Sequence, residues 1–189
     1  NNIFEGRIVS DPLGIKPNIR TVENFPISGI RFRDITKLIE TPEAFVKTCK
    51  ELTRITEEFG ANKIVSIESR GFIFAGPVAA DLHLPFILAR KPGKLPSETY
   101  KKDFNLEYGS TAIEIQKNTS IKRTDKLVII DDLVATGGTA IACADLLIEN
   151  FRVPKHQIMV LAIIDLVGLK GSQNIRKSGI KIKALVCYE

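Results

Sequence analysis

Short segments of almost uninterrupted apolar residues recur after residue 60, and stretches with helical periodicity separate most of them. The predicted strands cover residues 63–68, 84–90, 126–131, 156–166 and 180–187. Strands that are apolar along their whole length are typical of a parallel sheet that helices cover on both faces. The sequence therefore predicts an α/β fold with a mainly parallel five-stranded sheet flanked by helices.

The segments before and between these strands carry helix signals. Thr41 can cap a helix that starts at Pro42, and Gly60 can end it. Apolar side chains spaced three to four residues apart predict further helices at 71–82 and 139–151. In folds of this kind ligands bind at the carboxyl ends of the strands, so we expect the site in the segments that follow them.

Length and composition are those of an ordinary globular protein. With 189 residues, 44% of them hydrophobic and 26% charged, the chain suits a single domain over 1–189. No stretch approaches the ~20 apolar residues of a membrane helix, and the first residues lack a cationic head followed by an apolar run. We therefore expect a cytoplasmic protein with no membrane partner.

The net charge of +5 suits an anionic partner. A phosphorylated small molecule fits better than nucleic acid, because the chain has no recognition-helix pattern and no long run of lysine or arginine. The three cysteines and two histidines are scattered, which argues against a zinc site and against a disulfide framework. We expect no metal site made by protein side chains alone.

The segment DDLVATGGT begins with two carboxylates and ends in small and hydroxyl residues. Backbone amides of such residues converge at the start of a helix, where the helix dipole also favours an anion. The expected cradle for a monophosphate consists of Ala135, Thr136, Gly137, Gly138 and Thr139. The segment is neither a Walker loop nor a dinucleotide-binding turn, because GxxxxGK[ST] and GxGxxG are both absent.

A carboxylate repels a phosphate, so Asp131 and Asp132 should face hydrogen-bond donors further along the ligand. A sugar diol supplies such donors, and the pattern therefore predicts a ribose 5-phosphate. The alternative is an exposed acidic turn whose threonines and glycines only begin the next helix.

Two further segments at predicted strand ends are polar or basic. ESRG follows the strand 63–68, and RKPGK follows 84–90. Residues 91–103 hold two prolines, a glycine and four lysines, and we interpret them as a mobile basic lid that leads into a hairpin around Tyr108 and Gly109. A solvated loop without function is the alternative.

Together these blocks resemble the type I phosphoribosyltransferases, and among them the adenine phosphoribosyltransferases. The blocks are FRDIT at 32–36, ESRGF at 68–72, RKPGKLP at 90–96, LEYGSTAIEIQ at 106–116 and DDLVATGGTA at 131–140. The resemblance implies a small N-terminal hood over 1–35, a lid and hairpin over 91–116, and a homodimer. It also implies a cis peptide before Ser69.

The implied reaction joins adenine to phosphoribosyl pyrophosphate and gives AMP and pyrophosphate, with Mg²⁺ held mainly by the substrate. The loop and the aspartates would bind the phosphoribosyl group. Pyrophosphate would be bound by Ser69, Arg70, Arg90, Lys91 and Lys94.

By the same resemblance, Glu107 would handle the proton of the purine and Tyr108 would close over the site. Adenine would be bound by Ile30, Phe32, Arg33 and Leu166. Enzymes for 6-oxopurines commonly carry a lysine where this chain has Asp165 and Leu166, which favours adenine. Transfer to another base and a regulator that senses phosphoribosyl pyrophosphate are the alternatives.

Overall fold

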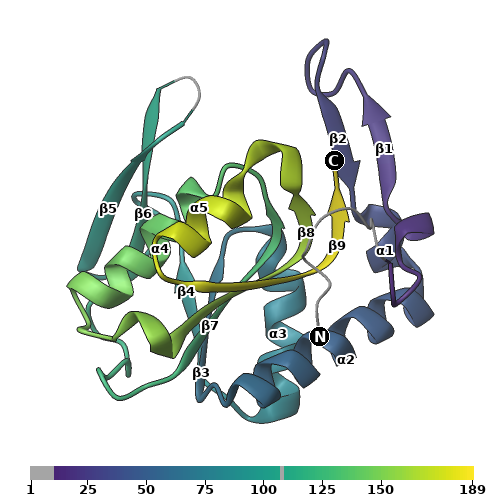
Figure 1. Cartoon of the computed structure of the whole chain (residues 1–189). Helices are drawn as coiled ribbons and strands as arrows, with labels where there is room; N and C mark the ends of the chain where they lie inside the picture. Colours follow the sequence, from purple (N-terminus) through teal and green to yellow (C-terminus); the bar gives the residue numbers. More distant parts are fainter. Residues whose placement is uncertain (1–10, 107–108) are drawn as a thin grey trace.

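The computed structural model describes residues 11–106 and 109–189, and a five-stranded sheet lies at its centre (Figure 1). The strands in spatial order are β4 (Phe86–Ala89), β3 (Lys63–Ile67), β7 (Leu127–Val134), β8 (Ile158–Leu166) and β9 (Lys181–Tyr188). Each neighbouring pair is parallel. The predicted α/β fold with a five-stranded parallel sheet is confirmed.

Helices cover both faces of this sheet and create two apolar cores. The helices are α1 (Thr36–Glu40), α2 (Pro42–Phe59) and α3 (Arg70–Leu82) on one face, and α4 (Gly138–Glu149) and α5 (Gly171–Lys177) on the other. Successive side chains of a strand point to opposite faces. Val128 of β7 therefore belongs to the same core as Phe74 of α3, whereas Ile129 belongs to the other core, with Leu146 of α4.

The predicted bounds of α2 are confirmed, but its predicted cap is wrong. Gly60 ends the helix with φ of 81°, and its amide donates to the carbonyl oxygens of Glu57 and Thr56. Thr41 stands at the N-cap position, yet its hydroxyl donates 2.7 Å back to the carbonyl oxygen of Lys37. The short helix α1 ends directly before α2. The hydroxyl of Thr41 therefore bonds to a carbonyl oxygen in the last turn of α1 and does not cap α2.

Two antiparallel hairpins flank the carboxyl-terminal edge of the sheet (Figure 1). One consists of β1 (Arg20–Glu23) and β2 (Arg31–Asp34), and the other of β5 (Thr99–Asn105) and β6 (Ser110–Gln116). Residues 99–103, predicted as part of a mobile loop, belong to β5. Short 3₁₀ turns complete the described elements: η1 (Lys16–Asn18), η2 (Lys155–Gln157) and η3 (Val167–Leu169).

Strand β7 is longer than the sequence predicts. It continues through the two aspartates to Val134, because Leu133 and Val134 still pair with Ile164 and Asp165 of β8. Asp131 and Asp132 therefore lie within the strand and not in a turn after it. Across the described residues, no helix is both long and apolar enough to cross a membrane.

Candidate active site

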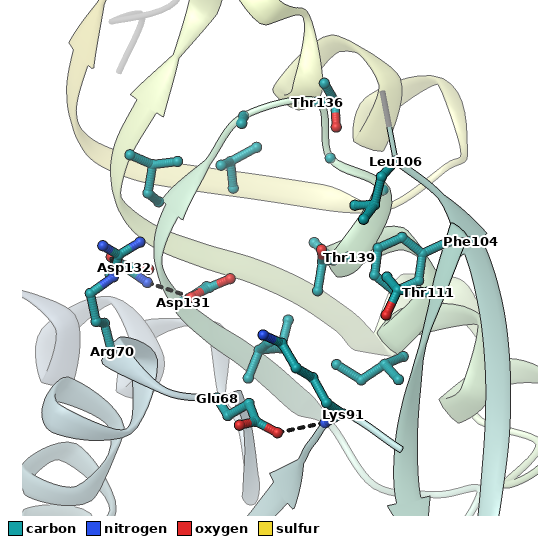
Figure 2. Close-up of a pocket in the computed structure, with 18 of the residues that line it drawn as sticks. Glu68, Arg70, Lys91, Phe104, Leu106, Thr111, Asp131, Asp132, Thr136 and Thr139 are labelled. Atoms are coloured by element: carbon teal, nitrogen blue, oxygen red, sulfur yellow. Dashed lines mark hydrogen bonds and ion pairs between the residues drawn. The ribbon is translucent and has the colours of Figure 1, made fainter. Parts of the chain in front are cut away.

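A cavity of about 650 Å³ lies at the carboxyl ends of β3 and β7 and beside the hairpin β5–β6 (Figure 2). It collects most of the residues that the sequence predicts for phosphate and sugar binding. Those that line it are Ser69, Arg70, Lys91, Asp131, Asp132, Ala135, Thr136, Gly137, Gly138 and Thr139.

The segment 135–139 contains the turn between β7 and α4 and the first two residues of α4, and it is called the turn 135–139 below. Gly137 adopts φ of 87°, a left-handed conformation that L side chains rarely adopt, and its carbonyl oxygen accepts the amide of Ile141 in the first turn of α4. The first amides of α4 have no partner within the helix, and the positive end of the helix dipole lies at Gly138 and Thr139, which line the cavity. The turn can therefore bind a phosphate through backbone amides and the threonine hydroxyls.

The protein does little to stabilise a negative charge on the Asp131 carboxylate. Figure 2 shows its side chain directed toward the part of the cavity that carries Thr139 and Thr111. Its Oδ1 accepts the amide of Asp132 at 2.8 Å. Burial, with the Asp132 carboxylate as a second cause, raises the pKa of Asp131 well above its usual range. A ligand hydroxyl that donates to this oxygen would relieve an unfavourable charge.

Asp132 is engaged differently. Its Oδ2 lies 2.8 Å from Nε of Arg70, and only 6% of the residue is exposed. The guanidinium of Arg70 also lies 5.4 Å from the ring centre of Phe32 in β2. Arg70 thus connects β7 with the N-terminal hairpin across the start of α3.

A close approach of α3 to β7 makes this pairing possible. A Cβ added at Gly71 would lie 2.8 Å from Oγ of Ser66 and 3.0 Å from the carbonyl oxygen of Ile130. The Ser66 hydroxyl itself donates to that carbonyl at 2.7 Å. A larger residue at Gly71 would therefore force α3 and the backbone of β7 apart.

The turn between β3 and α3 contains the cis peptide that the resemblance implies, between Glu68 and Ser69. Glu68 accepts the amide of Lys91 at 2.5 Å and lies 3.4 Å from Nε of Arg90. Burial acts to raise the pKa of Glu68, but the Lys91 amide and the Arg90 guanidinium outweigh it and hold the pKa below its usual range. Figure 2 shows the Lys91 ammonium above Glu68, directed into the cavity.

Two of the predicted pyrophosphate residues do not line the cavity. Arg90 directs its guanidinium to Glu68 and, at 3.4 Å, to the carbonyl oxygen of Lys94. Lys94 lies exposed in the loop between β4 and β5. The Arg90 guanidinium thus contacts the loop after β4 and not the cavity.

The predicted adenine residues lie on the side of the site formed by β2 and the ends of β8 and β9. Phe32 and Arg33 belong to β2, and Ile30 directly precedes it with 44% of its surface exposed. Arg33 lies 4.0 Å from the ring centre of Tyr188, which pairs with Leu166 across β8 and β9. This group reaches the cavity through the contact of Phe32 with Arg70.

Glu107 and Tyr108 lie outside the described residues. The described part of the same hairpin adds five residues that the sequence analysis missed. Phe104, Leu106, Thr111, Ala112 and Ile113 line the cavity, and Phe104 pairs with Thr111 across the hairpin. The alternation of side chains in a strand was the available signal, because Phe104 and Leu106 are two residues apart and share a face.

Mg²⁺ prefers oxygen ligands and retains several waters. Three carboxylates line the cavity, from Glu68, Asp131 and Asp132. Within 11–106 and 109–189, no group of three or more His, Cys, Asp or Glu side chains could hold a metal by itself. The cavity carboxylates are oxygen ligands of the kind that Mg²⁺ prefers, so they could contact an ion that a substrate brings into the cavity.

Comparisons with known proteins agree with this geometry. The family of the phosphoribosyl transferase domain matches residues 38–184. An adenine phosphoribosyltransferase of Actinobacillus succinogenes is 45% identical over 174 residues, which are 92% of this chain and 94% of the relative. One of Pelagibacter ubique is 43% identical over 93% of this chain and 98% of its own.

A solved structure is also similar. The adenine phosphoribosyltransferase of Giardia lamblia, complexed with 9-deazaadenine, has a TM-score of 0.85 and 33% identity, over 92% of this chain and 96% of its own. Fold and site together define a phosphoribosyl-transferring domain of the α/β class. The chain belongs to the phosphoribosyltransferase family, in its adenine phosphoribosyltransferase branch.

Proposed function

We propose that this protein transfers the phosphoribosyl group of 5-phosphoribosyl 1-pyrophosphate to adenine, giving AMP and pyrophosphate in purine salvage. The observation that carries the proposal is one cavity that contains both a poorly stabilised carboxylate, Asp131, and the amide turn 135–139. The carboxylate suits sugar hydroxyls, and the turn suits the 5-phosphate.

The reaction builds negative charge on the departing pyrophosphate and positive charge on the sugar ring. Arg70 and Lys91 line the cavity and would neutralise the pyrophosphate, aided by the backbone of Ser69. Asp131 and Asp132 would orient the ribose through its hydroxyls. Arg70 and Asp132 are paired in the protein without ligand. When the guanidinium of Arg70 turns to donate hydrogen bonds to the pyrophosphate, the carboxylate of Asp132 is free to accept hydrogen bonds from the sugar hydroxyls.

Mg²⁺ would be held by pyrophosphate and ribose oxygens, with Asp131, Asp132 and Glu68 as the nearest protein carboxylates. The ion supplies charge neutralisation of the leaving group. The protein's own part is to position the oxygens that bind the ion.

The sequence pattern LEYG suggests two further roles. Glu107 would transfer the proton that moves on the purine during the reaction, and Tyr108 would close over the site. The segment 91–116 then serves as lid and hairpin of a single domain, and 1–35 as hood. Adenine would lie beside Phe32, between Ile30, Arg33 and Leu166. The exposed apolar side chains of Ile30 and Phe25 supply a surface on which a purine can stack.

The test is an assay with Mg²⁺, phosphoribosyl pyrophosphate and one base at a time: adenine, hypoxanthine, guanine, xanthine and orotate. We expect AMP from adenine and at least a hundredfold lower kcat/KM with every other base, since an unpaired polar edge in the base site is costly. Efficient transfer to another base would overturn the substrate assignment. If no base is converted to a nucleotide, the assignment of transferase activity is wrong.

We further propose a cytoplasmic homodimer. The free thiols of Cys49, Cys143 and Cys187 suit a reducing compartment. Half-exposed Val46 on α2 and Ile73 on α3 supply apolar surface that a second copy could cover. Light scattering at micromolar concentration should give twice the chain mass of 20.9 kDa, and a monomer at all concentrations would contradict the dimer.

A further inference from the structure

The proposed phosphate-binding turn is backed from behind by a second element, the helix α5. A Cβ added at Gly171 would lie 2.8 Å from the amide nitrogen of Gly137 and 2.7 Å from Cγ1 of Val134, and closer still to the carbonyl oxygen of Ala135. A Cβ added at Gly137 would in turn lie 2.8 Å from the carbonyl oxygen of Gly171. The backbones of turn and helix therefore meet where neither has room for a side chain.

A side chain of α5 also holds this turn directly. Nδ2 of Asn174 donates to the carbonyl oxygen of Thr136 at 3.2 Å. Because the C=O and N–H of a trans peptide point to opposite sides, the amide of Gly137 points away from Asn174. The contact fixes the orientation of the peptide between Thr136 and Gly137.

Helix α5 is itself anchored to the sheet. Ser172 at the start of α5 and Asp165 in β8 are both buried, with 4% and 2% of their surfaces exposed, and the neighbouring Ser172 hydroxyl acts against the burial that raises the pKa of Asp165. Lys170 enters the helix with φ of 64°, in the left-handed region. The position of α5 relative to the end of β8 is therefore set by a buried contact that lies outside the cavity.

These observations carry one conclusion about the site. We propose that α5 is a positioning element whose Gly171 and Asn174 set the direction of the amides in 135–139, and so set the affinity for the 5-phosphate of the ligand. The inference rests on the proposed function, in which this turn binds that phosphate. Neither Gly171 nor Asn174 lines the cavity, so both act through the turn.

The test compares ligands that have a 5-phosphate with one that lacks it. Binding of ribose 5-phosphate, AMP and Mg²⁺–pyrophosphate to the full chain is measured by calorimetry. Gly171→Ala should weaken ribose 5-phosphate and AMP by roughly ten- to a hundredfold, since an error of about 1 Å in position costs that much. Mg²⁺–pyrophosphate should bind within about twofold of the unchanged protein, because α5 does not contact its proposed residues.

Two matched controls accompany this variant. Gly76→Ala makes the same change in helix α3 at a position where a Cβ has no neighbour within 4 Å, and it should leave all three affinities unchanged. Asn174→Asp removes the hydrogen-bond donor to the Thr136 carbonyl and hardly changes the shape of the side chain. This second variant tests the proposal if Gly171→Ala does not fold. Its control is Gln173→Glu, which adds the same charge at the exposed neighbouring position.

The outcomes separate this inference from the proposed function. Thr139→Val alters the turn itself, and an unchanged affinity for ribose 5-phosphate in that variant would remove the phosphate assignment. If Thr139→Val weakens ribose 5-phosphate but Gly171→Ala and Asn174→Asp do not, the role of α5 is wrong and the assignment of the turn stands. Equal weakening of all three ligands by Gly171→Ala would also overturn the role of α5, because it would indicate general damage.

Discussion

Nε of Arg70 lies 2.8 Å from Oδ2 of Asp132, so the two residues neutralise each other before any ligand binds. The sequence assigned them to opposite ends of the substrate, the arginine to pyrophosphate and the aspartate to the sugar. The pair gives a nearly buried carboxylate a cationic partner at the point where a second carboxylate, Asp131, adjoins it. It also means that the substrate has to compete for both groups.

This pair should be measurable as a coupling in stability. Arg70→Met leaves the Asp132 carboxylate without its counter-charge, and we expect it to lower the free energy of unfolding by about 1–3 kcal/mol. Asp132→Asn in the same background should recover part of that loss. Urea denaturation of both single variants and the double variant should give a coupling of about 1 kcal/mol, and additive effects would contradict the pairing.

The carboxylate of Asp131 should lower the free energy of unfolding at neutral pH, although it serves ligand binding. Its pKa is raised above the unfolded value of about 3.9, so the folded state holds this proton more tightly and loses stability as the pH rises above that value. Asp131→Asn should be about as stable as the unchanged protein at pH 4 and more stable at pH 7. Thermal melts over this range check the sign.

The same variant should bind phosphoribosyl pyrophosphate poorly. Loss of a charge-assisted hydrogen bond of about 1.5–3 kcal/mol corresponds to a kcat/KM lower by roughly ten- to a hundredfold. A variant that is both more stable at pH 7 and fully active would show that Asp131 does not contact the ligand.

Gly71 should tolerate no side chain. Gly71→Ala places a methyl group 2.8 Å from Oγ of Ser66 and 3.0 Å from the carbonyl oxygen of Ile130, and we expect a loss of about 1–3 kcal/mol in the free energy of unfolding. Gly76→Ala in the same helix has open space for its methyl group and should raise the free energy of unfolding by up to about 1 kcal/mol, because alanine favours a helix over glycine. An equal gain from Gly71→Ala would contradict the close approach to β7.

A buried ion pair at the amino end of the sheet should matter for stability alone. Nζ of Lys63 lies 2.5 Å from Oδ2 of Asp125, and Asp125 is 3% exposed. Asp125→Asn should cost about 3–5 kcal/mol in the free energy of unfolding and leave the KM for phosphoribosyl pyrophosphate unchanged. Urea denaturation and steady-state kinetics of one preparation test both statements.

The pH dependence of this contribution has the opposite sign to that of Asp131. Burial acts to raise the pKa of Asp125, but the hydrogen bonds from Lys63, Lys122 and Asn62 outweigh it and hold the pKa below its usual value. The stabilisation is therefore present above about pH 4 and is lost as the pH falls through the folded pKa. The stability difference between Asp125→Asn and the unchanged protein should shrink below pH 4. A difference that stays constant down to pH 2 would contradict this.

Those parts of the fold and the site that depend on local sequence patterns could be predicted from the sequence. The five apolar strands and the turn 135–139 are readable because strand burial and a glycine turn leave a continuous signature. The extension of β7 to Val134 was not readable, since it depends on pairing with residues of β8 some thirty positions away. For Phe104 and Thr111, side-chain alternation shows which hairpin residues share a face, but which of the two faces meets the cavity depends on what the hairpin packs against.

Long-range approach also explains the remaining gaps. Nothing local to Gly171 indicates that the turn 135–139 lies against it, and nothing local to Arg70 indicates its pairing with Asp132. In both cases a glycine permits two backbones to meet, and the sequence shows only that a small residue is present.

The most direct test is a crystal structure of the protein with AMP. The 5-phosphate should accept hydrogen bonds from backbone amides within 136–139, and a ribose hydroxyl should donate to Asp131. A nucleotide whose phosphate is bound elsewhere, with the turn 135–139 vacant, would contradict the assignment of the site.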